Sequence, residues 1–218
     1  MRLMYFDIDQ LTAALSYKLL TATVVPRPIA WVVTADARGT PNAAPFSFFN
    51  VFGGHPPAVC LGIGQRGQGE KDTLANIRTR GEFVINLVPE QLAQAMNLTA
   101  VDFPPGWNEL EQAGLAVEPC RKVHLPRIAH SPVALECRLK DAIALDAGGT
   151  GHTLVIGQVV AAHVLDEAVV DAARCHVDTA RLELIGRMQS PGGYIHTRDT
   201  FEMRRMDFAQ WQAAQAKG

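Results

Sequence analysis

The sequence predicts a mainly β domain that closes into a barrel, with a few short helices at its periphery. Six or seven apolar, β-branched segments of strand length follow one another along the chain, and few helical segments separate them. The regular alternation of strand and helix that is typical of a doubly wound parallel sheet is missing. The 218 residues, 48% of them hydrophobic, are enough for one domain with a large core but too few for two typical domains. We therefore expect one domain over residues 1–218.

The first expected elements are a helix and a β-hairpin. Apolar residues at near-helical spacing predict a helix over residues 9–20, and Pro26 and Pro28 prevent its continuation. β-Branched and aromatic residues predict a strand over residues 29–34. A short turn that contains Gly39 separates it from a second strand over residues 41–49.

The later elements are strands joined by loops and short helices. A Gly-rich loop over residues 64–70 leads into a helix that begins with Asp72 as its N-cap and ends at Gly81. Residues 99–118 are expected to form a loop, and Gly148-Gly149 a turn. Further strands are expected over residues 58–63, 83–88, 132–145, 153–165 and 182–185, and helices over residues 90–98 and 208–216.

Composition and charge argue against several functions. The formal net charge is −2, so we expect no basic surface for nucleic acid. No apolar run is long enough for a signal peptide or a membrane span, so the sequence predicts a cytoplasmic protein without membrane contact. The four cysteines form no CxxC pair, and no cysteine–histidine grouping has the spacing of zinc ligands, so no metal is expected.

The segment Lys71-Asp72-Thr73 lies where the Gly-rich loop meets the helix. The N–H groups of a helix start and the positive end of the helix dipole can hold a phosphate, to which Lys71 would add a charge and Thr73 a hydroxyl donor. The alternative is an ordinary helix cap formed by Asp72 beside a solvated Lys71. The segment does not fit the pattern of a Walker motif.

Two further segments present polar groups. Arg27 stands between two prolines, and its planar fork of donors suits a phosphate or a ring carbonyl. The alternative is a surface arginine in a rigid turn. In residues 42–50, small alanines would let a flat ring approach the backbone, and Ser47 and Asn50 supply polar atoms. The alternative there is a barrel strand whose phenylalanines fill the core.

The sequence does not identify catalytic residues. None of the seven histidines forms a recognisable triad or metal pair, and the sequence has neither a GxSxG nor an HExxH motif. His152 and His163 lie in or near the expected strand 153–165, where a structural role is more common than a catalytic one.

The order and spacing of three sequence blocks resemble those of the flavin reductase-like family. The blocks are PRPIAWVVTADARGTPNAAPFSFFNVF, PPAVCLGI and KDTLANIRTRGEFVINLV. Segments at residues 133–137, 155–160, 186–187 and 192–194 fit the same family. The resemblance covers about residues 17–200, and residues 201–218 would form a C-terminal tail. It implies an FMN-binding split barrel, a Greek-key antiparallel barrel of the flavoredoxin or flavoprotein oxygenase type.

The resemblance also implies a homodimer with two FMN sites at the subunit interface. The phosphate would lie near Lys71, Asp72 and Thr73, and the loop over residues 99–107 would face the substrate. Arg27 and Pro28 would border the flavin. The ring and ribityl chain would be lined by Thr34, Ala44, Pro45, Phe46, Ser47 and Asn50, and the site would be closed by Arg187 and Tyr194.

The implied function is that of an NAD(P)H-dependent FMN reductase or a flavoprotein oxygenase, which could serve a partner monooxygenase. FMN is expected rather than FAD, because the sequence has no second loop for a pyrophosphate. NAD(P)H would be a transient co-substrate that stacks directly on the flavin, because no Rossmann site is visible. One alternative is a flavin-binding electron carrier or sensor without NAD(P)H turnover. Another is a barrel that has lost flavin, which the intact PRP and KDT blocks argue against.

Overall fold

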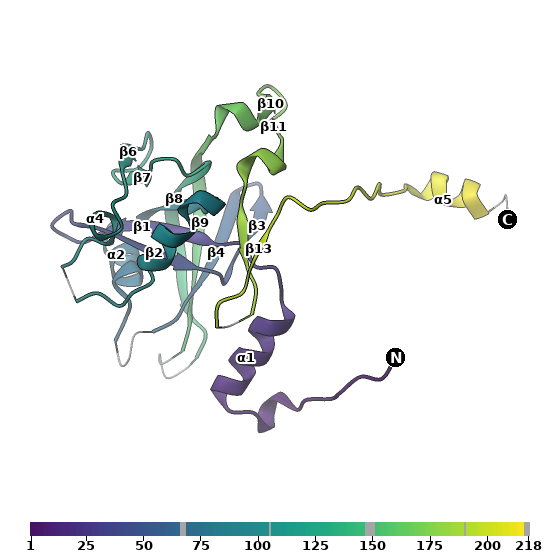
Figure 1. Cartoon of the computed structure of the whole chain (residues 1–218), viewed down its shortest axis with the longest axis horizontal. Helices are drawn as coiled ribbons and strands as arrows, with labels where there is room; N and C mark the ends of the chain where they lie inside the picture. Colours follow the sequence, from purple (N-terminus) through teal and green to yellow (C-terminus); the bar gives the residue numbers. More distant parts are fainter. Residues whose placement is uncertain (66–68, 105, 147–150, 190, 216–218) are drawn as a thin grey trace.

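The computed structural model describes residues 1–65, 69–104, 106–146, 151–189 and 191–215, and it has the mainly β architecture that the sequence predicts. Its body is a seven-stranded sheet in which neighbouring strands are antiparallel (Figure 1). Across the sheet the order is β2 (Pro41–Phe46), β1 (Ala30–Ala35), β5 (Glu82–Leu87), β8 (Val133–Ala144), β9 (Thr153–Val164), β4 (Pro57–Ile63) and β3 (Phe49–Gly54). Strand β2 also contacts β4, so the sheet curls into a split barrel.

Shorter elements complete the described part of the chain. Three two-stranded ribbons pair β6 (Val117–Pro119) with β7 (Pro126–Ile128), β10 (Val169–Asp171) with β11 (His176–Val177), and β12 (Ile185–Arg187) with β13 (Tyr194–His196). The α-helices are α1 (Ala13–Thr23), α2 (Asp72–Arg80), α3 (Ala93–Leu98), α4 (Glu109–Gln112) and α5 (Phe208–Gln215). The 3-10 helices are η1 (Ile8–Gln10), η2 (Glu90–Leu92), η3 (Asp166–Ala168) and η4 (Thr179–Leu182).

Strand β1 is buried along its whole length because its side chains alternate between two apolar clusters. Ala30 and Val32 pack in a cluster shared by β1, β4, β5 and helix α2. Trp31 and Val33 point the other way, into a cluster that includes Met96 of α3. A strand with apolar residues on both faces therefore holds the two halves of the core together.

Several expected boundaries were wrong. The first helix starts later than residue 9, because Thr12 is its N-cap and its side chain accepts the N–H of Leu15. The strand expected over residues 41–49 is interrupted after Phe46, and β3 begins at Phe49, so the chain turns between two different strands. The strand expected over residues 182–185 begins only at Ile185, after η4.

Other expectations were incomplete or lie outside the described residues. The loop expected over residues 99–118 contains α4 and the first residues of β6. The turn expected at Gly148-Gly149 and the end of the last helix at residue 216 fall outside the described part of the chain. Among the described residues, no helix is both long and apolar enough to span a membrane.

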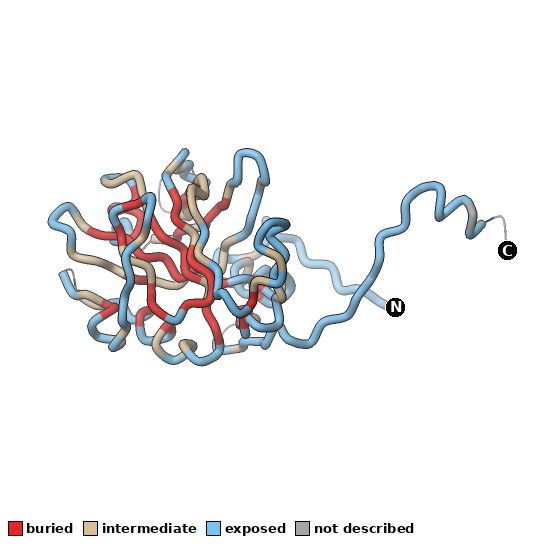
Figure 2. The backbone as a smooth tube through the Cα atoms, turned by 90° about the horizontal axis from the view of Figure 1, so that it is seen from above, coloured by how far each residue is buried: buried red, intermediate tan, exposed pale blue. Residues whose placement is uncertain are grey.

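Both chain ends extend away from the barrel (Figure 1), and their residues are almost all exposed (Figure 2). These arms carry large apolar side chains, among them Tyr5, Phe6, Phe201 and Trp211. Apolar side chains that are exposed in a single chain commonly mark a surface that another molecule covers.

Candidate functional site

Helix α2 begins without a side-chain cap. Its N-cap residue is Lys71 and its first helical residue is Asp72, so the expectation of Asp72 as the N-cap was wrong. The Lys71 ammonium lies 5.9 Å from the centre of the Phe46 ring. A helix start that has a lysine beside it and no side-chain cap offers N–H groups and a positive dipole end to an anion.

Three cavities surround Pro45 on strand β2. The first, of about 760 Å³, runs from Pro45 to Arg187 and Tyr194. The second, of about 320 Å³, and the third, of about 110 Å³, both reach Lys71. The structure thus gathers nine of the predicted site residues around these cavities: Ala44, Pro45, Phe46, Ser47, Lys71, Asp72, Thr73, Arg187 and Tyr194.

A chain of polar side chains lies beneath the start of α2. The hydroxyl groups of Thr34 and Thr73 donate to Asn42 Oδ1, at 3.2 and 3.1 Å. Asn76 Nδ2 donates to Thr34 Oγ1 at 3.1 Å. At the other end, Asn42 Nδ2 donates to Glu109 Oε1 at 2.9 Å. This network ties α2 to β1, β2 and α4 directly below the predicted phosphate site.

Glu109 is a residue of this site that sequence reasoning missed, because it falls in a segment expected to be a loop. It is only 7% exposed, and its Oε2 accepts the backbone N–H of Ala43 at 3.2 Å. Burial raises the pKa of the Glu109 carboxyl above its usual range, although its hydrogen bonds partly oppose this. The one sequence signal was Asn108, a residue type that favours the N-cap of a helix.

Arg27 is buried, which excludes the alternative of a surface arginine in a rigid turn. Its Nη1 donates to the carbonyls of Thr21 and Val24, at 2.6 and 2.8 Å, and its Nη2 to that of Met188 at 2.8 Å. Its Nε lies 3.4 Å from Ser47 Oγ. Burial lowers the pKa of the guanidinium. Arg27 therefore fastens three backbone segments together and borders the cavities through Ser47.

Three further predicted residues, Pro28, Thr34 and Asn50, line none of the three cavities around Pro45. Thr34 is fully buried within the polar network. Asn50 is exposed on β3, and its side chain accepts the N–H of the next residue. Pro28 lines a separate cavity of about 200 Å³ beside Arg27. The guanidinium of Arg187 lies 4.6 Å from the centre of the Tyr194 ring, a cation–π contact that pre-forms this wall of the site.

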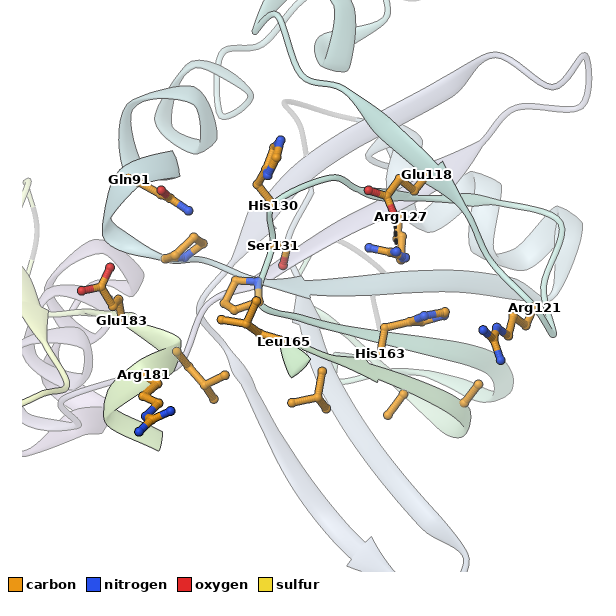
Figure 3. A pocket seen from close by; sticks show the side chains of 16 residues that line it. Gln91, Glu118, Arg121, Arg127, His130, Ser131, His163, Leu165, Arg181 and Glu183 are labelled. Carbon is orange, nitrogen blue, oxygen red and sulfur yellow. Dashed lines mark hydrogen bonds and ion pairs between the residues drawn. The ribbon is translucent and has the colours of Figure 1, made fainter. Parts of the chain in front are cut away.

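A larger cavity, of about 840 Å³, contains none of the predicted site residues. Figure 3 shows Glu118 and Arg127 on one side of it and Arg181 and Glu183 on the other. Arg127 is paired with Glu118, and Arg181 Nε lies 3.1 Å from Asp178. The ion pairs of Arg127 and Arg181 with acidic side chains reduce what these two arginines can offer to an anion in this cavity.

Behind the 840 Å³ cavity, the tertiary structure brings together Cys120, Glu136 and His163. The Glu136 carboxylate accepts the backbone N–H groups of residues 121–123, at 2.9, 2.5 and 3.0 Å, and lies 2.6 Å from His163 Nε2. Burial raises the pKa of the Cys120 thiol to about 12. Each Glu136 oxygen thus already has two hydrogen-bond partners, and the group holds the loop against β8 and β9.

Solved structures share this architecture over nearly the whole chain. Nitrilotriacetate monooxygenase component B from Bacillus cereus matches with a TM-score of 0.87 and 29% identity, over 93% of this chain and 100% of that one. The 2-nitrobenzoate 2-nitroreductase NbaA of Pseudomonas fluorescens matches with a TM-score of 0.84 and 33% identity, over 94% and 98%. An uncharacterized protein of Deinococcus radiodurans is 46% identical over 214 residues, which are 95% of this chain and 92% of that protein.

The split-barrel fold and these relatives define a flavoprotein of the oxidoreductase class. The model of the flavin reductase like domain matches residues 22–178, and the chain belongs to this family. The resemblance drawn from the PRP and KDT blocks is therefore confirmed at the level of family and fold.

Proposed function

We propose that this chain binds FMN in the cavities around Pro45 and acts as an NAD(P)H-dependent FMN reductase or flavoprotein oxygenase. The observation that carries the proposal is the start of α2, which has Lys71 beside it and no side-chain cap, next to cavities that reach along β2. One end of this site suits a phosphate and the other a flat ring.

Each part of the site has a role in this proposal. Lys71 and the first turn of α2 hold the phosphate, and the backbone of β2 around Pro45 supports the ring. Ser47, oriented by the Nε of Arg27, faces the polar edge of the ring. Bound FMN would supply the redox chemistry, and the protein would position it and shield it from water.

The 760 Å³ cavity on the Arg187 side leaves room for a second ligand beside the flavin. We assign it to the nicotinamide of NAD(P)H. Arg187 and Tyr194, which contact each other at its wall, would hold a phosphate or cover the nicotinamide. No protein acid or base is needed for a hydride transfer, which agrees with the lack of a catalytic triad in the sequence.

We further propose that two chains form a homodimer that completes each flavin site. The exposed apolar side chains of both arms support this, as do Val51 and Phe52, which are exposed on the edge strand β3. A second copy that covers these groups would remove apolar surface from water. Light scattering is expected to give twice the mass of one chain, and the mass of a single chain would contradict this assembly.

The purified protein is expected to bind FMN, which heating should release, and the visible absorption band of the bound flavin should bleach on adding NADH or NADPH. Protein that takes up no FMN at micromolar concentration would refute the proposed function. Bound flavin that neither NADH nor NADPH bleaches would favour an electron carrier or sensor instead.

A further inference from the structure

The polar network beneath α2 has a fixed hydrogen-bond direction, and Glu109 sets it. Both oxygens of Glu109 act as acceptors, as those of an ionised carboxylate do. Glu109 uses one oxygen for the N–H of Ala43 and the other for the amide of Asn42. Asn42 must therefore turn its NH₂ group toward Glu109 and its oxygen toward the two threonines.

This orientation decides what Thr73 can offer to a ligand. A hydroxyl group has one proton, and both Thr34 and Thr73 give theirs to Asn42 Oδ1. The Thr34 oxygen also accepts a hydrogen bond, from Asn76 Nδ2. Thr73 lines the 110 Å³ cavity with only lone pairs left, whereas its place at the start of the helix had predicted a hydroxyl donor for a phosphate.

We propose, building on the FMN site proposed above, that Glu109 is a specificity-determining residue that leaves Thr73 as an acceptor at the phosphate end of the flavin. A phosphate dianion also only accepts, so Thr73 gives it no hydrogen bond. The phosphate is then held by Lys71 and the backbone of α2. The Thr73 oxygen instead suits a donor, such as a hydroxyl group of the ribityl chain.

The substitution Glu109→Gln would reverse the direction of the network while keeping its shape. The glutamine carbonyl must still accept the N–H of Ala43, so its NH₂ group faces Asn42. Asn42 then turns round and donates to the threonines, and Asn76 turns with it so that its Oδ1 accepts the proton that Thr34 no longer gives to Asn42. Thr73 keeps its own proton and can donate it to the phosphate.

The test measures the dissociation constants of FMN and riboflavin for four proteins: the parent, Glu109→Gln, Thr73→Val and the double variant. The ratio of the two dissociation constants reports the contribution of the phosphate to binding, because changes in folding or in the ring site affect both flavins. We expect Glu109→Gln to raise the preference for FMN by about tenfold, the effect of one hydrogen bond to a charged group. Thr73→Val in the parent should change the ratio by less than about threefold, because Thr73 gives the phosphate no hydrogen bond.

The double variant separates orientation from charge. Loss of the Glu109 charge alone would favour FMN whether or not Thr73 has a hydroxyl group, whereas the orientation effect needs that hydroxyl group. We therefore expect the gain to disappear in the double variant. A gain that persists there, an unchanged ratio in Glu109→Gln, or a large selective loss in Thr73→Val would each overturn the proposal. Should Glu109→Gln fail to fold, the result for Thr73→Val in the parent still decides it. A parent that binds neither flavin would instead refute the FMN site itself.

Discussion

Replacing Lys71 with alanine should weaken FMN far more than riboflavin. Lys71 is half-buried at the start of α2 and borders both cavities that reach the predicted phosphate site. A hydrogen bond to a charged group is worth about 1.5–3 kcal/mol, and the partial exposure of Lys71 favours the lower end of that range. The affinity for FMN should therefore fall about tenfold. The affinity for riboflavin, which lacks the phosphate, should change by less than about threefold, since only the charge-assisted contact is removed.

Titrations of flavin fluorescence with both ligands give the two affinities. Arg78→Ala is the matched control, because Arg78 is a cation on the same helix whose partner is Glu70. It should leave both affinities unchanged. The loss of FMN affinity in Lys71→Ala should also shrink at high salt, where screening weakens the contact in the parent. Equal weakening of both flavins would show that Lys71 supports the loop and does not contact the phosphate.

Two further substitutions test the residues that hold the site together. Arg27→Ala leaves three buried or half-buried carbonyls without their donor, so it should lower the free energy of unfolding by about 3 kcal/mol or more and weaken both flavins equally. Urea denaturation measures the free energy of unfolding. A fully stable Arg27→Ala variant that loses affinity for FMN but not for riboflavin would contradict the prediction. Burial alone would raise the pKa of Glu136, but the hydrogen bonds from backbone N–H groups and His163 hold it below its usual range. Its stabilising contribution is therefore present above the unfolded-state pKa and is lost as the pH falls through the folded-state pKa. Thermal unfolding of Glu136→Gln should accordingly depend less on acidification than that of the parent, and parallel pH profiles would disprove this.

Local sequence patterns were enough to predict the class of fold. The alternation along residues 29–34 predicted a strand, because apolar side chains on a strand point to opposite faces, and β1 has this pattern. Gly81 was expected to end the helix after Lys71, and it is the C-cap, with a φ of 70° that suits glycine. The PRP and KDT blocks indicated the family, which the match over residues 22–178 confirms.

The tertiary structure alone decided which groups the polar side chains contact. Arg27 bonds to a carbonyl 161 residues away, and Asn42 to a carboxylate 67 residues away, so no local pattern could assign either partner. The tertiary structure likewise decided the break between β2 and β3, because the two strands lie at opposite ends of the strand order of the sheet. The sequence by itself determined backbone preferences and the burial pattern, because both arise from neighbouring residues. The direction of the Glu109 network was decided only by packing, because hydrogen bonds in a core are fixed by groups that folding brings together.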